Sequence, residues 1–213
     1  MSATRRPRRP RRPRRTQIVF GAVAIAALLS SGCGEFVRQS QSPSQLVIGS
    51  ILTAAGVGGV PTTFASGPLL SDVPAAGQTV FDDFGQATLR VILRDPGASG
   101  SPTAPSSLND VTITRYTVTY TRSGGPNGLN TPGVDVPRPI DGALTLTVPV
   151  GQSAAGVFEL VRRVAKVEAP LAVLGSSPEV LTMIAEVTFY GRDQAGNNLS
   201  ASGSVQVNFA NFN

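Results

Sequence analysis

The clearest pattern of hydrophobic and polar residues lies near the end of the chain. Apolar side chains alternate with polar ones along two runs, Leu181–Phe189 and Leu199–Phe209. Residues 191–198 join the runs and contain Asp193 and Gly196-Asn197, which are typical turn residues. Strict alternation predicts strands with one buried face, so we expect the two runs to pair as a β-hairpin.

Three earlier stretches also alternate: Thr88–Arg94, Val111–Arg122 and Leu144–Val148. The second changes phase, because its apolar residues fall on odd positions first and on even positions afterwards: Val111 and Ile113, then Tyr116, Val118 and Tyr120. A slip of one residue reverses the face of every later side chain. A bulge or bend near Thr114–Arg115 is therefore predicted, since it would return both halves to one face.

Other stretches are less regular. For Val157–Leu171 we predict a strand to about Arg162, and then a short helical turn near Ala169–Leu174. The apolar run Leu46–Leu52 fits either a first strand or a short helix, and Ala54–Gly77 has the Gly, Pro, Ser and Thr content of a loop.

About seven short strands separated by turns predict an all-β, antiparallel β-sandwich. The hairpin segment Ala185–Asn197 resembles the closing strands of immunoglobulin-like and fibronectin-III-like domains of bacterial surface proteins. At the level of pattern the resemblance extends over Asp83–Phe212, although the chain has no cysteine pair and no tryptophan. A lipocalin-like barrel is the alternative fold.

The start of the chain has a different character. An arginine- and proline-rich run, Arg5–Arg15, precedes the apolar stretch Ile18–Leu29 and then Ser30-Ser31-Gly32-Cys33, as in a secretory signal peptide. This arrangement resembles a bacterial lipoprotein signal, although Ser30 stands where leucine is preferred. The resemblance implies cleavage before Cys33 and attachment of acyl chains to it.

An apolar stretch of about 12 residues is too short to span a bilayer, which needs about 20. The alternatives are a cleaved signal without lipid, or an uncleaved anchor with its arginines in the cytoplasm. The pair Arg14-Arg15 also resembles a twin-arginine export signal, but the residues that follow fit that signal poorly.

These features predict four parts: a signal peptide (1–32), a lipid-attached flexible tether (33–45), a loop-rich segment packed on the domain (46–78) and a β-sandwich domain (79–213). The expected location is outside the cytoplasm and anchored to a bacterial membrane. Gly34 follows the cysteine where aspartate favours retention in the inner membrane. The resemblance therefore implies the outer membrane or cell surface, with the periplasmic face as the alternative.

The positive charge is concentrated in the leader. Eight of the 18 basic residues lie between Arg5 and Arg15, whereas all 13 acidic residues lie at Glu35 or later. The mature chain is therefore mildly acidic, which does not fit a nucleic-acid partner, because such binding depends on many Lys and Arg contacts to phosphate. The expected partners are the membrane, through lipid on Cys33, and another envelope protein.

Few residues are candidates for chemistry. The chain has no histidine and one cysteine, which excludes histidine-based triads and disulfides within the chain. The pair Asp82-Asp83 is a weak candidate for a hard-cation site or an acid–base pair. Asp193, with Asn197 and Asn198, is a weak candidate for calcium. We interpret Asp82 and Asp83 as solvated residues where a strand begins and Asp193 as a turn residue, and we expect neither a cofactor nor a metal.

Two further groups have alternative interpretations. Arg162, Arg163 and Lys166 form a basic cluster that fits anionic lipid or, as we expect, an edge with ion pairs to Glu159 and Glu168. Tyr116 and Tyr120 share one strand face and fit either a sugar-stacking platform or, as we expect, core positions.

Three functional hypotheses follow from the sequence. The first is a lipid-anchored structural or interaction protein without catalysis, which could bind a partner by strand addition at a sheet edge. The second is a binding module for carbohydrate or a small apolar molecule. The third is a carboxylate-dependent hydrolase.

Overall fold

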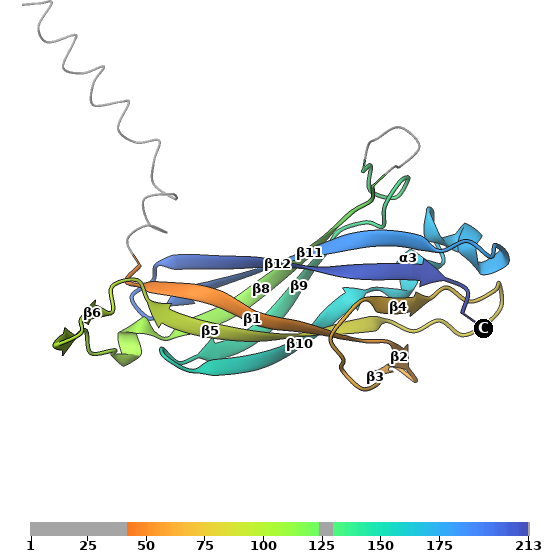
Figure 1. Cartoon of the computed structure of the whole chain (residues 1–213). Helices are drawn as coiled ribbons and strands as arrows, with labels where there is room; N and C mark the ends of the chain where they lie inside the picture. The colour runs from red at the N-terminus through yellow and green to blue at the C-terminus, as the bar shows by residue number, and fades with distance from the viewer. Residues whose placement is uncertain (1–41, 124–129, 213) are drawn as a thin grey trace, which may run out of the picture. The chain divides into compact units, whose positions relative to one another are not determined.

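The described part of the computed structural model, residues 42–123 and 130–212, is an all-β domain (Figure 1). It contains a three-stranded sheet and a five-stranded sheet. The smaller sheet has the order β1 (Ser44–Ala54), β5 (Asp83–Leu93), β10 (Ser153–Val161). The larger sheet has the order β4 (Leu69–Asp72), β12 (Asn198–Ala210), β11 (Leu181–Asp193), β8 (Val111–Thr121), β9 (Ile140–Val148).

An aromatic cluster joins the two sheets into one core. Phe158 of β10 lies 5.2 Å from Tyr116 of β8 and 5.3 Å from Phe189 of β11, measured between ring centroids. The Phe158 and Phe189 rings meet edge to face, at 83°. Such geometry is favourable for aromatic pairs. The predicted all-β class is thus confirmed, as two sheets packed on each other.

Two details of the fold differ from the expectation. The two sheets contain eight strands in place of about seven, and β4 pairs with β12 in parallel, whereas the other pairs within these two sheets are antiparallel. The additional strand is only four residues long. It is too short for alternation to reveal it within a stretch that has the composition of a loop.

The predicted hairpin and the predicted bulge are both confirmed. β11 and β12 pair over their whole length, from Leu181 opposite Phe209 to Arg192 opposite Asn198. The register of β8 shifts at Thr114 against both β9 and β11. As a result, its odd- and even-numbered apolar residues all lie in the core.

The predicted division of the N-terminal part is wrong in two places. Ser42 and Ser44 are already buried in the domain, so the predicted tether of 33–45 extends too far. Segment 46–78, predicted as loop-rich, also contributes β4 and most of β1, which pairs with β5 over its length. Of the two interpretations of Leu46–Leu52, the first strand is therefore the correct one. A register shift between Ile48 and Ser50 interrupts the alternation of β1, which is why the sequence shows only a short apolar run there.

The remaining elements are short. Two-residue strands form the hairpins β2 (Gly56–Val57) with β3 (Val60–Pro61) and β6 (Gly97–Ala98) with β7 (Ser101–Pro102). The 3-10 helix η2 covers Ser107–Asn109. Between β10 and β11 lie the helix α3 (Arg163–Lys166) and the 3-10 helix η3 (Leu171–Ser176). η3 overlaps the helical turn predicted near Ala169–Leu174, whereas α3 was not predicted.

The domain has two distinct ends (Figure 1). One end, which we call the α3 end, carries α3, η3 and the first residue of β11, Leu181. At the other end, Ser42 donates a hydrogen bond of 2.9 Å to Asp193, the last residue of β11. A strand rises about 3.3 Å per residue, so the ends of β11 lie about 40 Å apart.

Candidate functional site

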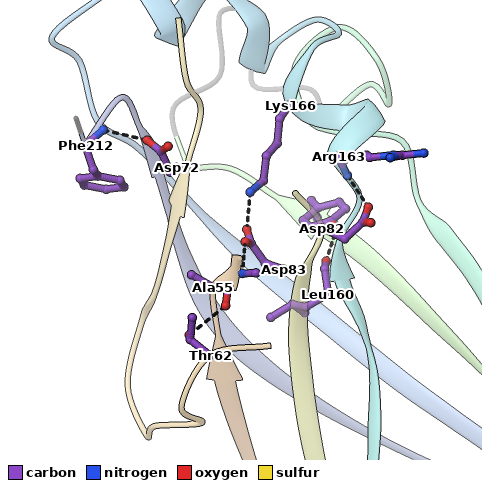
Figure 2. A network of polar contacts seen from close by, with 11 residues as sticks. Ala55, Thr62, Asp72, Asp82, Asp83, Leu160, Arg163, Lys166 and Phe212 are labelled. Carbon is purple, nitrogen blue, oxygen red and sulfur yellow. Dashed lines mark hydrogen bonds and ion pairs between the residues drawn. The ribbon is translucent and has the colours of Figure 1, made fainter. Parts of the chain in front are cut away.

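The two neighbouring aspartates lie where β5 begins, at the α3 end. Asp83 is 1% exposed, so the expectation that it is solvated is wrong. Its Oδ2 atom lies 2.8 Å from Nζ of Lys166, whose side chain is 3% exposed. Figure 2 shows the Lys166 side chain directed at Asp83. The Oδ1 atom of Asp83 accepts a hydrogen bond of 3.1 Å from the backbone N–H of Gly56. A buried carboxylate requires such partners, because it has lost its hydration.

Asp82 has a different role. Its Oδ1 atom accepts a hydrogen bond of 2.7 Å from the backbone N–H of Arg163, the first residue of α3 (Figure 2). Asp82 therefore holds the start of α3, while Asp83 holds the Lys166 side chain at its end. The pair fixes α3 against the start of β5, and both carboxylates are engaged in structural contacts.

The basic cluster divides between surface and interior. Arg162 donates from Nε to Glu159 at 2.9 Å, as expected, and this hydrogen bond raises the pKa of Arg162. Lys166 is instead buried against Asp83, which corrects the expectation of an exposed edge. Glu168 lies 3.9 Å from Arg138, which the sequence did not connect with it.

Tyr116 and Tyr120 are core residues, as predicted, with 3% and 4% exposure. Each also has a polar contact to β10 in the other sheet. The Tyr116 hydroxyl accepts from the Glu159 backbone N–H at 3.2 Å, and the Tyr120 hydroxyl donates to the Leu160 carbonyl at 2.5 Å. Burial raises the pKa of both tyrosines, and the charge of Asp83 adds to the effect on Tyr120.

The α3 end also exposes apolar side chains. Val164, Val167 and Val173 lie within α3, η3 and the link between them, and they are 53%, 60% and 67% exposed. We call these three residues the valine surface. The three residues lie within ten positions of one another along the chain. Single exposed apolar residues are normal on proteins, whereas a contiguous apolar patch marks an interaction site. No pattern in the sequence predicted this surface: the ambiguous stretch Val157–Leu171 includes Val164 and Val167 but not Val173.

A cavity lies beside the valine surface. It has a volume of about 280 Å³ and lies between the segment Pro137–Ile140 and the segment from Arg162 to Ala169. Tyr120 and Val164 are among its lining residues. No sequence pattern connected these two segments, which are far apart along the chain.

Asp193 lies at the opposite end of the domain and stabilises the turn that follows β11. It accepts hydrogen bonds from the backbone and side chain of Asn197, both at 2.8 Å, and from Ser42. Burial alone would raise the pKa of Asp193, but these hydrogen bonds and one from the Ala195 backbone lower it below the usual value. The turn role predicted for Asp193 is confirmed.

The described residues contain no group of three or more His, Cys, Asp and Glu side chains placed to hold a metal ion. Asp82, Asp83 and Asp193 therefore belong to no such group. In the described ranges no helix is both long and apolar enough to cross a membrane. Cys33, the predicted lipidation site, lies outside the described residues.

Comparisons with known proteins add little. No protein-family model matches the sequence, and no curated protein matches it. A similar solved structure is the solution structure described as that of a "putative late embryogenesis abundant (LEA) protein At2g46140.1", with 8% identity over 92% of this chain and 89% of that chain. Its TM-score is 0.42, and no inference about function rests on a likeness this weak.

Proposed function

We propose that this chain is a lipid-anchored protein of the bacterial cell envelope, whose domain of immunoglobulin-like or fibronectin-III-like type binds another envelope protein without catalysing a reaction. The observation that carries this proposal is the valine surface. Interfaces have apolar centres, and a contiguous apolar patch is a common sign of one, so we infer that the three exposed valines contribute to such a patch.

The position of the valine surface supports an anchored arrangement. The described domain begins at Ser42, which contacts the end of β11, whereas α3 and η3 lie next to its start. The two ends of this strand are about 40 Å apart. A lipid on Cys33 would lie nine residues before Ser42 in the sequence, and Ser42 itself lies at the end of the domain opposite the valine surface.

The contacts of the aspartates support a non-catalytic role. A general acid or base needs a side chain that reaches the substrate proton. Asp83 is buried and occupied by Lys166 and Gly56, and Asp82 accepts from the backbone of Arg163. The hydrolase hypothesis loses its main candidates in this way. The sugar-platform hypothesis is weakened too, because both tyrosines on the shared strand face are buried.

Site-specific photocrosslinking in intact host cells tests the interaction. A photoreactive phenylalanine analogue replaces Val167 or Val173, and a matched control carries it at Thr145, an exposed residue of β9. We expect one discrete crosslinked protein from both valine positions and not from Thr145. The second variant Val173→Asp should remove the crosslink from Val167. A crosslink of equal yield from all three positions, or from none, would contradict the proposal.

A ligand-binding role is the second candidate function. The cavity of about 280 Å³ beside α3 favours it.

A further inference from the structure

The cavity beside α3 combines an apolar floor with a charged rim. Tyr120 and Ile140, 4% and 3% exposed, belong to the floor, together with Ala165. The Tyr120 hydroxyl already donates to the Leu160 carbonyl, so the ring offers the cavity an apolar surface. Pockets that bind small molecules have this composition, with mostly apolar walls and a few polar groups that orient the ligand.

The rim of the cavity carries two guanidinium groups. Arg138, Arg162 and Glu168 line the cavity, which gives two cations and one anion. Arg162 is paired through Nε with Glu159, which is not part of the lining. Arg138 lies 3.9 Å from Glu168, longer than a hydrogen bond of about 3 Å. Each arginine thus lies near one glutamate, so the charges of these four side chains balance. The remaining N–H groups of the two guanidiniums suit a carboxylate, which they can bind through two parallel hydrogen bonds.

We propose that this cavity is a binding site for a small amphipathic monocarboxylate, with the apolar part on Tyr120 and Ile140 and the carboxylate at Arg138 and Arg162. The volume sets the size of the ligand. A water molecule occupies about 30 Å³ of liquid, so about 280 Å³ corresponds to about nine non-hydrogen atoms, the size of a carboxylate with about six or seven carbons in all. The site does not depend on lipid attachment, and it goes beyond the partner binding proposed for the valine surface.

Titration of the full chain with three matched probes tests the site. Hexanoate, hexan-1-ol and hexylamine share an apolar chain and differ in charge. Nuclear magnetic resonance follows the amide signals of Ile140 and Ala165 while each probe is added. We expect hexanoate to bind about five- to tenfold more tightly than hexan-1-ol, because charge-assisted hydrogen bonds are the stronger ones, and hexylamine to bind most weakly.

Variants separate the charged rim from the apolar floor. Arg138→Gln and Arg162→Gln should each weaken hexanoate binding about three- to tenfold and leave hexan-1-ol binding almost unchanged. The matched control Arg90→Gln, on the exposed side of β5 and outside the lining, should change neither. Ala165→Leu should fill the cavity and abolish binding of both probes.

The two arginine variants alter exposed side chains, so they test the proposal even if Ala165→Leu does not fold. Hexanoate binding no tighter than hexan-1-ol binding, hexanoate affinity unchanged by both arginine variants, or no saturable hexanoate binding would each overturn the proposal.

Discussion

Replacement of Lys166 by methionine should destabilise the domain strongly. Lys166 is the cation beside the buried carboxylate of Asp83, at 2.8 Å, and both side chains are at most 3% exposed. Methionine has a similar length and leaves the apolar part of the side chain in place. The variant therefore removes the charge while keeping most of the packing, and it leaves the Asp83 carboxylate without its charge partner.

The structure sets the size of this effect. Two unit charges 2.8 Å apart attract by about 6 kcal/mol at an effective dielectric constant of about 20. The cost of removing both charges from water offsets much of that attraction in the intact pair. Removal of one partner leaves the other buried and uncompensated, and typically costs about 3–5 kcal/mol. We expect Lys166→Met to lower the free energy of unfolding by this amount.

A double-mutant cycle isolates the pair. The second change is Asp83→Asn, which retains an oxygen to accept from Gly56. The combined variant should be less destabilised than the sum of the single variants, by at least about 2 kcal/mol. Urea unfolding at 25 °C, followed by circular dichroism, measures all four proteins.

The exposed pair Arg115–Asp141 is the matched control. Its two hydrogen bonds, 2.7 and 2.9 Å, are geometrically as good, but both side chains are more than half exposed. The cycle Arg115→Gln with Asp141→Asn should give a much smaller coupling, since solvent screens exposed pairs. Equal coupling for the two pairs, or a loss below about 1 kcal/mol for Lys166→Met, would refute the reasoning that burial makes the Asp83–Lys166 pair important.

Further predictions concern single side chains. Tyr120→Phe leaves the buried Leu160 carbonyl without this donor and should lower the free energy of unfolding by about 1–3 kcal/mol in the same urea assay; no change would contradict the hydrogen bond. The pKa of Asp193 is lowered in the folded state, so its stabilising effect is present above the ordinary aspartate pKa of about 3.9 and is lost as pH falls through the folded value. The difference in unfolding free energy between wild type and Asp193→Asn should therefore be larger at pH 7 than at pH 3. An equal or larger difference at pH 3 would contradict the stabilising role of the ionised Asp193 carboxylate. The Ser71 hydroxyl is buried without a hydrogen-bond partner in the described part of the chain, so Ser71→Ala should be neutral or stabilising by up to about 1 kcal/mol. A clearly lower melting temperature of the variant in thermal denaturation would show that the hydroxyl has a partner.

The sequence predicted features of the fold that depend on local alternation. The β11–β12 hairpin and the bulge at Thr114 follow from the period of two, and burial of Tyr116 follows from its place on the apolar face. A period reports which side of a strand is apolar. It does so reliably where the strand is long and the other face is polar.

The sequence could not predict contacts between distant segments. The prediction that Asp83 is solvated is wrong because its charge partner, Lys166, lies 83 residues away in a helix of four residues. A helix this short has no period that could show which side chains it buries. The cavity combines segments on either side of β9 and β10 for the same reason, so neither its floor nor its rim was visible in the pattern.

The proposed function depends most directly on the attachment of Cys33 to a membrane, and one measurement tests this. The intact mass of the protein is measured after purification from membranes of its own host, beside the variant Cys33→Ala. We predict a mass that begins at Cys33 and includes acyl chains, and in the variant the loss of those acyl chains together with release into the soluble fraction. A mass that retains residues 1–32, or a mature protein without acyl chains, would contradict the account.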